Sequence, residues 1–599
     1  MSDPSITGPA SGSAARSARG SAVSRLLAAA LVAGPWTGWL HTIELAVERQ
    51  GLGHFTWYSR EFIWMSPIAY TLFFLAVSVP VLVVAMLAPR IARVEVAAGW
   101  VALLGVFGLL LPYPEVGRLA ALILAFGVAV QVWRMVQRYA PWWRRVTPWV
   151  VLTNLALIGA IAVLQPLARR AGERRVTAAL PAAPAGAPNV LLIILDTVRA
   201  ASLSLYGFPY PTSPHLSALA TGGVTFDQAY APAPWTLPSH ASYLTGRWPF
   251  ELTADWTVPL DGKTPVITEA FRARGYHTAA IVANHDYTAF DSGLARGFTH
   301  FEDYLVSWPQ LIHSTSYTQT AAVRRVMNAD ELSDLFKAVR TLDLSIDPKH
   351  HGDERRAGSV TGAFLDWQRA HGDRPFFAML NYFDAHLGYY APPGFPRIES
   401  PRAGRYHTAI SWIDANLDRL FTELGARGVL DNTVVIVTSD HGELFNEHGL
   451  SGHANNLYRN VLHVPLVVRY PARVPAGVRV PWPISLRDLA ATIADLAALP
   501  GSVVPGTSLR AAWEGDTTRL SPVLAHVSRA PNVDASFPTA RGDLTTLIDD
   551  ERHYIRNFGG GEELFAWRRD SLELSDLATT SPAERASYRA RLERLTGRR

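Results

Sequence analysis

The sequence predicts an α/β catalytic domain with a mostly parallel central sheet, preceded by an all-α transmembrane domain. Three observations support this prediction. The chain has 599 residues, which is too long for one hydrophobic core. Apolar residues make up 49% of it and concentrate before residue 170. After residue 188, short apolar runs alternate with amphipathic helical patterns, as in α/β domains.

The N-terminal part contains five apolar runs, each close to the ~20 residues that a helix needs to cross a bilayer. One such run alone could be a buried globular helix, but five in succession predict a membrane domain. The first could also be a cleaved signal peptide, but its apolar stretch is too long and lacks a small-residue cleavage site. We therefore interpret it as an anchor. The runs lie at 26–47, 64–88, 95–112, 116–136 and 147–167.

The arginine distribution predicts the orientation of these spans. Arginines cluster before the first span, after the second and after the fourth, which indicates cytoplasmic loops. An odd number of spans then places the remainder outside the cytoplasm. Four arginines between 169 and 175 oppose this orientation, but charge beside a large translocated domain is a weak determinant. We expect a multi-pass protein of the cell membrane with an extracytoplasmic catalytic domain.

A segment rich in Pro, Ala and Gly at 176–188 has no periodic apolar face and indicates a linker. Cysteine is absent, which excludes disulfides, thiolate ligands and a cysteine nucleophile. The net charge of +4 is mild and predicts no nucleic-acid surface. The expected organisation is a flexible N-terminus at 1–25, a membrane domain of about five helices at 26–168, a linker at 169–188, a catalytic domain at 189–530 and a C-terminal subdomain at 531–599.

Within the catalytic domain, "NVLLIILD" (189–196) is a continuous apolar run that ends in an acid, as expected of a strand covered on both faces. Similar runs occur at 277–284, 375–383, 432–440 and 463–470. Helical patterns intervene, for example at 264–275 and 407–428. In such sheets, ligands bind beyond the carboxyl ends of the strands.

Two of these strand ends carry chemically useful residues. Asp196 ends the first run, and Asp440 with His441 ends "TVVIVTSDHGE". A buried carboxylate needs a partner, and two carboxylates with an imidazole suit a divalent cation such as Zn²⁺ or Mn²⁺. Each residue taken alone would more readily be a helix cap or turn former.

The segment "PAPWTLPSHASYLTG" contains a candidate nucleophile. Pro238 suits the first turn of a helix, so Thr236 lies at or just before the helix N-terminus. There the hydroxyl faces unpaired amides and the positive end of the helix dipole. Thr236 alone would more readily be a simple N-cap. A bound dication would favour nucleophilic attack, because coordination lowers the pKa of the hydroxyl.

Four ordered segments resemble the sulfatase branch of the alkaline phosphatase superfamily. They are "NVLLIILDTVRA", "LYGFPYPTSPHLSALATGGVTFDQAYAPAPWTLPSHASYLTGR", "YHTAISWIDANLDRL" and "TVVIVTSDHGELFNEHG". The resemblance extends over roughly 189–580 and implies the α/β sandwich of that superfamily. It implies that Asp196, Asp440 and His441 are metal ligands, and that Thr236 is the nucleophile and also contacts the metal.

The departures from sulfatases are informative. Sulfatases oxidise a Cys or Ser at the nucleophile position to formylglycine, and threonine cannot form that aldehyde. They also have an Arg where this chain has His240, a second acid where it has Thr197, and lysines around the ester, which this chain lacks at 189–262 and after Lys349. A threonine nucleophile with five spans is instead similar to lipoteichoic acid synthases and phosphoethanolamine transferases, although those typically have Glu in place of Asp196.

Four further residues are candidates for the site. His386 lies just after a strand end, and His453 lies thirteen residues beyond Asp440. Histidines at similar places in phosphoethanolamine transferases contact the phosphoryl group or a second metal, and we expect both to be catalytic, with surface-loop histidines as the alternative. His240 and Arg199 are expected to bind substrate, with a structural histidine and a solvated arginine as the alternatives.

The expected function is a membrane-anchored, metal-dependent hydrolase or transferase of phosphate esters. The expected cofactor is one divalent metal (Zn, Mn, Mg or Ca), with a second possible, and the partners are the lipid bilayer and a lipid or cell-envelope glycan substrate. One alternative is a sulfuric ester hydrolase working without formylglycine, and another is a non-catalytic envelope scaffold. Residues 285–360 are expected to form loops over the site.

Overall fold

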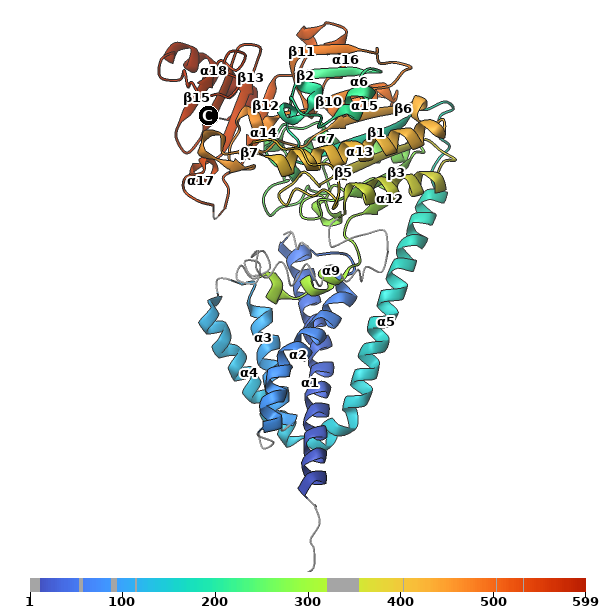
Figure 1. Ribbon diagram of the computed structural model, residues 1–599, viewed down its shortest axis with the longest axis vertical. Coiled ribbons are helices and arrows are strands. Elements are labelled where there is room, and N and C mark those ends of the chain that lie inside the picture. The colour runs from blue at the N-terminus through green and yellow to red at the C-terminus, as the bar shows by residue number, and fades with distance from the viewer. Residues whose placement is uncertain are drawn as a thin grey trace, which may run out of the picture. The chain divides into compact units, whose positions relative to one another are not determined.

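The computed structural model describes residues 11–52, 58–87, 94–113, 116–319, 355–401, 403–501, 504–531 and 533–598. These residues form two compact units, which we describe separately (Figure 1). The membrane unit comprises the described residues within Met1–Leu52, Tyr58–Gly172 and Leu305–Asp353. The catalytic unit comprises those within Glu173–Tyr304 and Glu354–Arg599.

The membrane unit is helical. Four helices are long and apolar enough to cross a bilayer, and α3 is a shorter apolar helix of 17 residues. The number of spans and the orientation therefore stay predictions. The helices are α1 (Ser11–Val47), α2 (Phe62–Leu87), α3 (Val94–Leu110), α4 (Arg118–Arg138) and α5 (Ala140–Ala178).

Apolar side chains on α4 and α5 point outward, which suggests contact with lipid. Only 22% of the apolar window of α4 and 11% of that of α5 is buried. Trp149, Leu152 and Leu164 of α5 are each more than half exposed. Such a surface would be unusual in water, where large exposed apolar patches mark interaction or membrane sites.

Residues 305–319 belong to the membrane unit, although the sequence predicted loops over the active site there. They include α9 (Trp308–His313) and a 3-10 turn at Ser316–Gln319. The Ser316 hydroxyl donates to the Gly108 carbonyl at 2.6 Å, and the Tyr317 ring stacks on Phe73 with centroids 4.4 Å apart. Residues 320–354 of the same region lie outside the described residues.

The catalytic unit is built on a nine-stranded sheet whose main path runs β11-β2-β10-β6-β1-β5-β3-β4, with β9 paired to β2. Strands β6, β1, β5, β3 and β4 are mutually parallel, and β10 is antiparallel to both of its neighbours. This confirms the predicted mostly parallel sheet. The strands are β1 (Asn189–Leu195), β2 (Val224–Tyr230), β3 (His277–Val282), β4 (His300–Glu302), β5 (Phe376–Tyr382), β6 (Thr433–Thr438), β9 (His463–Val464), β10 (Leu466–Arg469) and β11 (Val478–Ser485).

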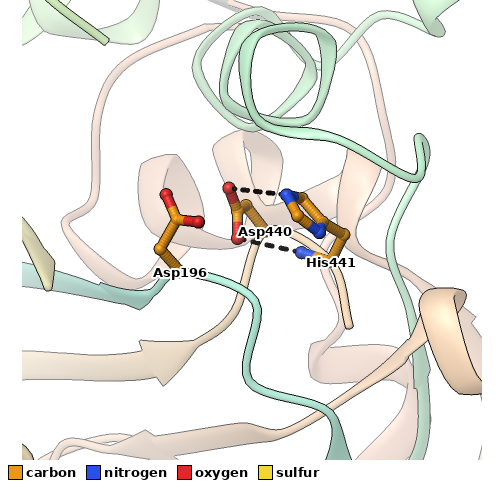
Figure 2. Close-up of side chains that lie close together, drawn as sticks. All are labelled: Asp196, Asp440 and His441. Atoms are coloured by element: carbon orange, nitrogen blue, oxygen red, sulfur yellow. Dashed lines mark hydrogen bonds and ion pairs between the residues drawn. The ribbon is translucent and has the colours of Figure 1, made fainter. Parts of the chain in front are cut away.

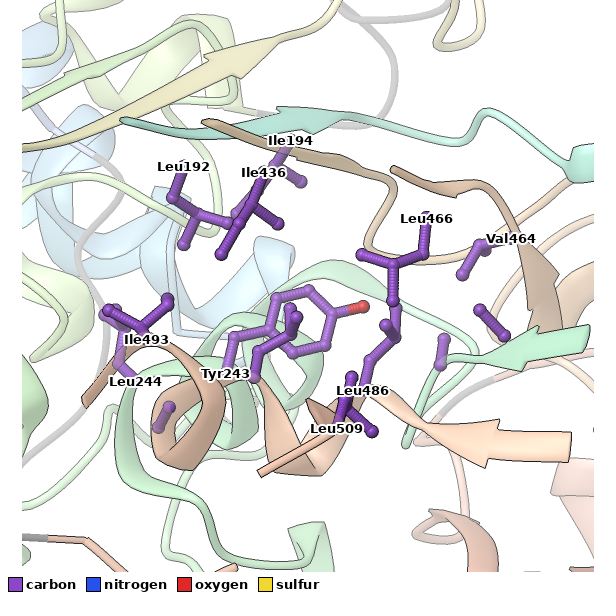
Figure 3. Packing of buried hydrophobic residues seen from close by; sticks show 14 of the residues in the cluster. Leu192, Ile194, Tyr243, Leu244, Ile436, Val464, Leu466, Leu486, Ile493 and Leu509 are labelled. Carbon is purple, nitrogen blue, oxygen red and sulfur yellow. The ribbon is translucent and has the colours of Figure 1, made fainter. Parts of the chain in front are cut away.

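Helices cover both faces of this sheet, which explains the unbroken apolar runs. Alternate residues of β1 face opposite layers: Leu191 and Ile193 pack with α12 and α13, whereas Leu192 and Ile194 pack with α7 and α15. Figure 3 shows Leu192 and Ile194 in the second layer near Tyr243 of α7. The helices are α6 (Pro214–Ala220), α7 (Thr236–Thr245), α8 (Ile267–Ala273), α12 (Ala357–Ala370), α13 (Gly404–Ala426), α14 (Arg459–Leu462), α15 (Leu489–Leu496) and α16 (Arg510–Trp513).

The predicted strand at 463–470 forms two short strands instead of one. Pro465 separates β9 from β10, because proline has no amide hydrogen to donate to a neighbouring strand. β9 pairs with β2, whereas β10 also pairs with β6.

The C-terminal part contains a second, antiparallel sheet of order β12-β13-β14-β15. Tyr554, Leu564 and Leu592 contribute to its separate apolar cluster. Its elements are β12 (Val523–Val527), α17 (Pro538–Arg541), β13 (Leu544–Ile548), β14 (His553–Asn557), β15 (Glu562–Phe565) and α18 (Pro582–Thr596).

Candidate active site

Thr236 is the first residue of α7, as predicted. The Ser239 hydroxyl donates to the Ala233 carbonyl at 3.0 Å and so fixes the turn that enters the helix. Gly246 ends the helix at φ 68°, a left-handed conformation that favours glycine. The Tyr243 hydroxyl donates to the Ser439 carbonyl at 2.8 Å, which ties α7 to the end of β6. Both ends of α7 and its middle are therefore fixed, and Thr236 with them.

Asp196 directly follows β1 and is fully buried. Its Oδ2 accepts hydrogen bonds from Nδ2 of Asn284 at 2.9 Å and from Nδ2 of Asn381 at 3.3 Å. These amides follow β3 and lie in β5, the next strands in the sheet. Its Oδ1 is buried and makes no hydrogen bond to any described residue. Among the described residues, Oδ2 of this carboxylate thus has hydrogen-bond donors, whereas Oδ1 has none.

Asp440 lies two residues after β6 and is also fully buried. Its Oδ1 accepts the backbone amides of Thr197 at 3.2 Å and of His441 at 3.0 Å. Thr197 reaches this position with φ 61°, an unusual conformation for a β-branched residue. Asp440 Oδ2 makes no hydrogen bond to any described residue and lies 3.5 Å from His441 Nε2.

Asp196, Asp440 and His441 converge at one point, as Figure 2 shows. One ligand atom of each lies within 4.8 Å of the others. Thr236 Oγ1 lies 3.4 Å from His441 Nε2 and accepts Asn284 Nδ2 at 3.1 Å. The structure therefore brings the predicted nucleophile beside the predicted ligand set.

This cluster fits a divalent cation. Burial raises the pKa of Asp440 to about 7, and burial with the nearby Asp440 charge raises that of Asp196 well above its usual range. His441 Nδ1 donates to the Gly442 carbonyl at 3.0 Å, so Nε2, which lies 3.4 Å from Thr236 Oγ1, carries a lone pair that can bind a cation. Burial lowers the pKa of His441. A neutral imidazole and two carboxylates with orphaned oxygens would be stabilised by Zn²⁺ or Mn²⁺.

Gly442 allows a close approach behind these ligands. A Cβ at this position would lie 2.2 Å from the Asn460 carbonyl and 2.9 Å from Arg199 Cβ. Both contacts are shorter than real Cβ atoms show, so only glycine fits after His441 without movement of the backbone.

His386 and His453 both lie near this cluster. The His453 ring centroid is 4.5 Å from that of His441 and 5.2 Å from that of His386. His453 Nδ1 bonds the Glu443 carboxylate at 3.2 Å, and this contact outweighs burial and raises the pKa of His453. Burial, with the neighbouring His453, lowers the pKa of His386 to about 3. The two histidines are therefore chemically distinct, with His453 more readily protonated.

The two predicted substrate-binding residues make different contacts near the ligands. His240 Nδ1 donates to the Thr236 carbonyl at 2.9 Å and lies 3.7 Å from Asp440 Oδ2, and burial lowers the pKa of His240 to about 4. Arg199 Nη1 donates to Glu447 at 2.7 Å and to the Glu443 carbonyl at 3.0 Å. Arg199 thus holds the loop after His441, and its role in binding substrate stays a prediction.

Sequence reasoning missed Asn284, Asn381 and Glu443. Asn284 ends the apolar run at 277–284, so the rule that singled out Asp196 could have found it. Asn381 is a polar residue inside an otherwise apolar strand, which is also a readable signal. Glu443 becomes visible only through the pairing of two short strands, which the sequence does not reveal.

A hydroxyl, two carboxylates and an imidazole thus lie at the carboxyl edge of a mostly parallel sheet, in a domain of the alkaline phosphatase-like fold class. Residues 188–499, more than half of the chain, match the sulfatase family. The protein belongs to the sulfatase family, whose enzymes are metal-dependent hydrolases.

Two relatives illustrate the sequence similarity. Steryl-sulfatase of Mus musculus is 28% identical over 429 residues, covering 57% of this chain and 67% of that protein. Arylsulfatase A of Homo sapiens is 28% identical over 371 residues, covering 58% of this chain and 70% of that protein.

Two solved structures share the fold. The phosphonate monoester hydrolase of Agrobacterium radiobacter matches with a TM-score of 0.53 at 20% identity, covering 68% of this chain and 95% of that chain. The phosphonate monoester hydrolase from Silicibacter pomeroyi matches with a TM-score of 0.51 at 23% identity, covering 69% and 94%. These likenesses confirm the predicted fold class.

Proposed function

We propose that the protein is a membrane-anchored hydrolase or transferase of phosphate esters, acting on phosphodiester head groups through Thr236. One observation carries the proposal: Thr236 Oγ1 lies 3.4 Å from His441 Nε2 and 3.1 Å from Asn284 Nδ2. The N-cap of α7 is Trp235, so Thr236 is the first helical residue and its hydroxyl is not in the capping position. This placement favours chemistry over capping for Thr236.

Asp196, Asp440 and His441 would hold the cation, with Thr236 beside it. When bound, a divalent cation would lower the pKa of the threonine hydroxyl and offset charge on the phosphoryl oxygens. Asn284 would orient both Asp196 and Thr236, because its one amide nitrogen reaches both. The N-terminus of α7 adds unpaired amides for a second phosphoryl oxygen.

In the proposed reaction, Thr236 releases its proton to solvent and its oxygen attacks phosphorus in line. The Oγ1–P bond forms, the P–O bond to the leaving alcohol breaks, and His453 or His386 donates a proton to the departing oxygen. Water or an acceptor hydroxyl then attacks the phosphothreonine and returns a proton to that histidine. Thr236 departs as the leaving oxygen and is reprotonated, so the enzyme is regenerated.

The chemistry of the chain favours phosphate over sulfate. Threonine carries a methyl group on its β-carbon and cannot be oxidised to an aldehyde. The described residues include one lysine, Lys263, which is exposed. A sulfuric ester hydrolase is the second candidate, because steryl-sulfatase and arylsulfatase A are among the curated relatives. The apolar N-terminal helices favour a substrate in the membrane or cell envelope. The arginine distribution favours the extracytoplasmic side for the catalytic unit.

The test uses the full-length protein in detergent with four nitrophenyl esters: a phosphodiester, a phosphomonoester, a phosphonate monoester and a sulfate. We expect the phosphodiester to react fastest and Thr236→Ala to lower kcat by a factor on the order of 10⁴ or more. Thr245→Ala is the matched control, because Thr245 is buried in the same helix and bonds only the backbone.

Each outcome separates the candidates. Preferential turnover of the sulfate ester would support the second candidate. Absence of turnover for all four esters with added Zn²⁺ or Mn²⁺ would favour a non-catalytic scaffold. Full activity in Thr236→Ala would refute the assignment of the nucleophile.

A further inference from the structure

A small hairpin next to the metal ligands brings Glu443 and His453 face to face. Strands β7 (Leu444–Phe445) and β8 (Ser451–Gly452) are antiparallel, with Leu444 opposite Gly452. Continuing this register by one residue places Glu443, just before β7, opposite His453, just after β8. The backbone pairing of the hairpin therefore brings Glu443 and His453 together, although they are ten residues apart in the chain.

The side chains of Glu443 and His453 contact each other across this pairing. His453 Nδ1 lies 3.2 Å from Glu443 Oε2 and 3.4 Å from Oε1. Glu443 is only 1% exposed, and within the described residues its carboxylate bonds one side chain, that of His453. Burying a carboxylate is costly unless it is paired, so Glu443 and His453 are a specific pair.

The pairing also decides which nitrogen of His453 faces the site. Because Nδ1 donates to Glu443, Nε2 is the nitrogen left for a substrate. The His453 ring lies beside His441, and its side chain is 20% exposed, whereas His441 is fully buried. His453 therefore sits on the open side of the cluster that contains Thr236.

We propose that Glu443 is a positioning residue that holds His453 with Nε2 toward the leaving oxygen. This inference rests on the proposed phosphoryl chemistry at Thr236. In the first step, the Nε2–H proton of His453 passes to the departing oxygen as the P–O bond breaks. In the second step, the attacking water returns a proton to Nε2. Glu443 keeps its bond to Nδ1–H in both steps and itself exchanges no proton.

The consequence is a dependence on the leaving group. A nitrophenolate departs readily without a proton, whereas an alkoxide needs one in the transition state. Disordering His453 should therefore slow esters of poorly acidic alcohols more than nitrophenyl esters. A merely structural role for Glu443 would slow all esters by the same factor.

The experiment measures kcat/KM on full-length protein for phosphodiesters with nitrophenyl, phenyl and alkyl leaving groups. We expect Glu443→Ala to slow the alkyl ester about 10- to 100-fold more than the nitrophenyl ester. Glu443→Gln keeps an oxygen acceptor for Nδ1–H and the shape of the side chain, so its effect should be smaller. His453→Asn should match Glu443→Ala, and the double variant should add no further loss.

Glu447→Gln is the matched control. Glu447 lies in the turn of the same hairpin and pairs with Arg199, but it does not contact His453. We expect this variant to keep the wild-type dependence on the leaving group. The inference is overturned if Glu443→Ala slows all esters equally, or if the losses of the two single variants multiply. Absence of phosphodiester turnover in the wild type, or persistence in Thr236→Ala, would instead overturn the proposed function.

Discussion

Replacing Asp440 with Asn should stabilise the cation-free protein while abolishing its function. Asp440 and Asp196 are fully buried and present ligand atoms within 4.8 Å of each other. Asparagine can keep the Oδ1 bonds to the amides of Thr197 and His441, because only Oδ2 becomes nitrogen. The substitution therefore removes one charge and few contacts.

The magnitude follows from Coulomb's law. At 4.8 Å, the upper limit of the separation between their ligand atoms, and an effective dielectric constant of 20, two unit charges repel by about 3.5 kcal/mol. Since burial raises the pKa of Asp440 to about 7, Asp440 carries its charge mainly above that pH. At pH 8 in a chelator, we expect Asp440→Asn to raise the free energy of unfolding by about 2–3 kcal/mol.

The assay is thermal unfolding of full-length protein at pH 8, with EDTA and with excess Zn²⁺ or Mn²⁺. The cation should stabilise the wild type strongly and the variant weakly. Asp414→Asn is a matched control, because Asp414 is also buried but accepts the backbone amides of His215 and Leu216. That control should lose stability in both conditions. The reasoning is refuted if Asp440→Asn destabilises the chelated protein, or if it retains cation-dependent stabilisation equal to the wild type.

Three further predictions follow from the site. Asn284→Ala removes hydrogen-bond donors to Asp196 and Thr236. It should lower kcat about 10- to 100-fold, because hydrogen bonds to charged groups contribute about 1.5–3 kcal/mol. An unchanged kcat would contradict this prediction. Gly442→Ala places a Cβ against the Asn460 carbonyl and should cost roughly 1–3 kcal/mol of stability in urea unfolding. In the cation-free protein, burial raises the pKa values of Asp196 and Asp440, which stabilises the folded state below about pH 4. This stabilisation is lost as the pH rises through the pKa of Asp440, about 7. Added cation should abolish this fall of the melting temperature with pH in thermal unfolding scans.

The parallel core of the fold was predictable because its strands are buried on both faces. The apolar runs that begin at 189, 277, 375 and 432 contain β1, β3, β5 and β6. The strand β2 reads "VTFDQAY" and was not identified, because polar residues interrupt its pattern. Its neighbours β10 and β11 come much later in the chain, so only tertiary structure reveals its pairing.

The candidate site was predictable where a residue ends a strand or begins a helix. Asp196, Asp440 and Thr236 occupy such positions, and the carboxyl edge of the sheet brings them together. Glu443 could not be found in this way, because its role depends on the pairing of the two-residue strands β7 and β8, in which Leu444 lies opposite Gly452. The membership of residues 305–319 in the membrane unit was equally hidden, since no local pattern marks the Ser316 and Tyr317 contacts.

The most direct test of the central claim is intact and peptide mass spectrometry of protein quenched during phosphodiester turnover. We predict a phosphoryl adduct on the peptide that contains Thr236, at a level that falls to zero in Thr236→Ala. Turnover that continues in that variant, or an adduct carried by another residue, would contradict the claim that Thr236 is the nucleophile.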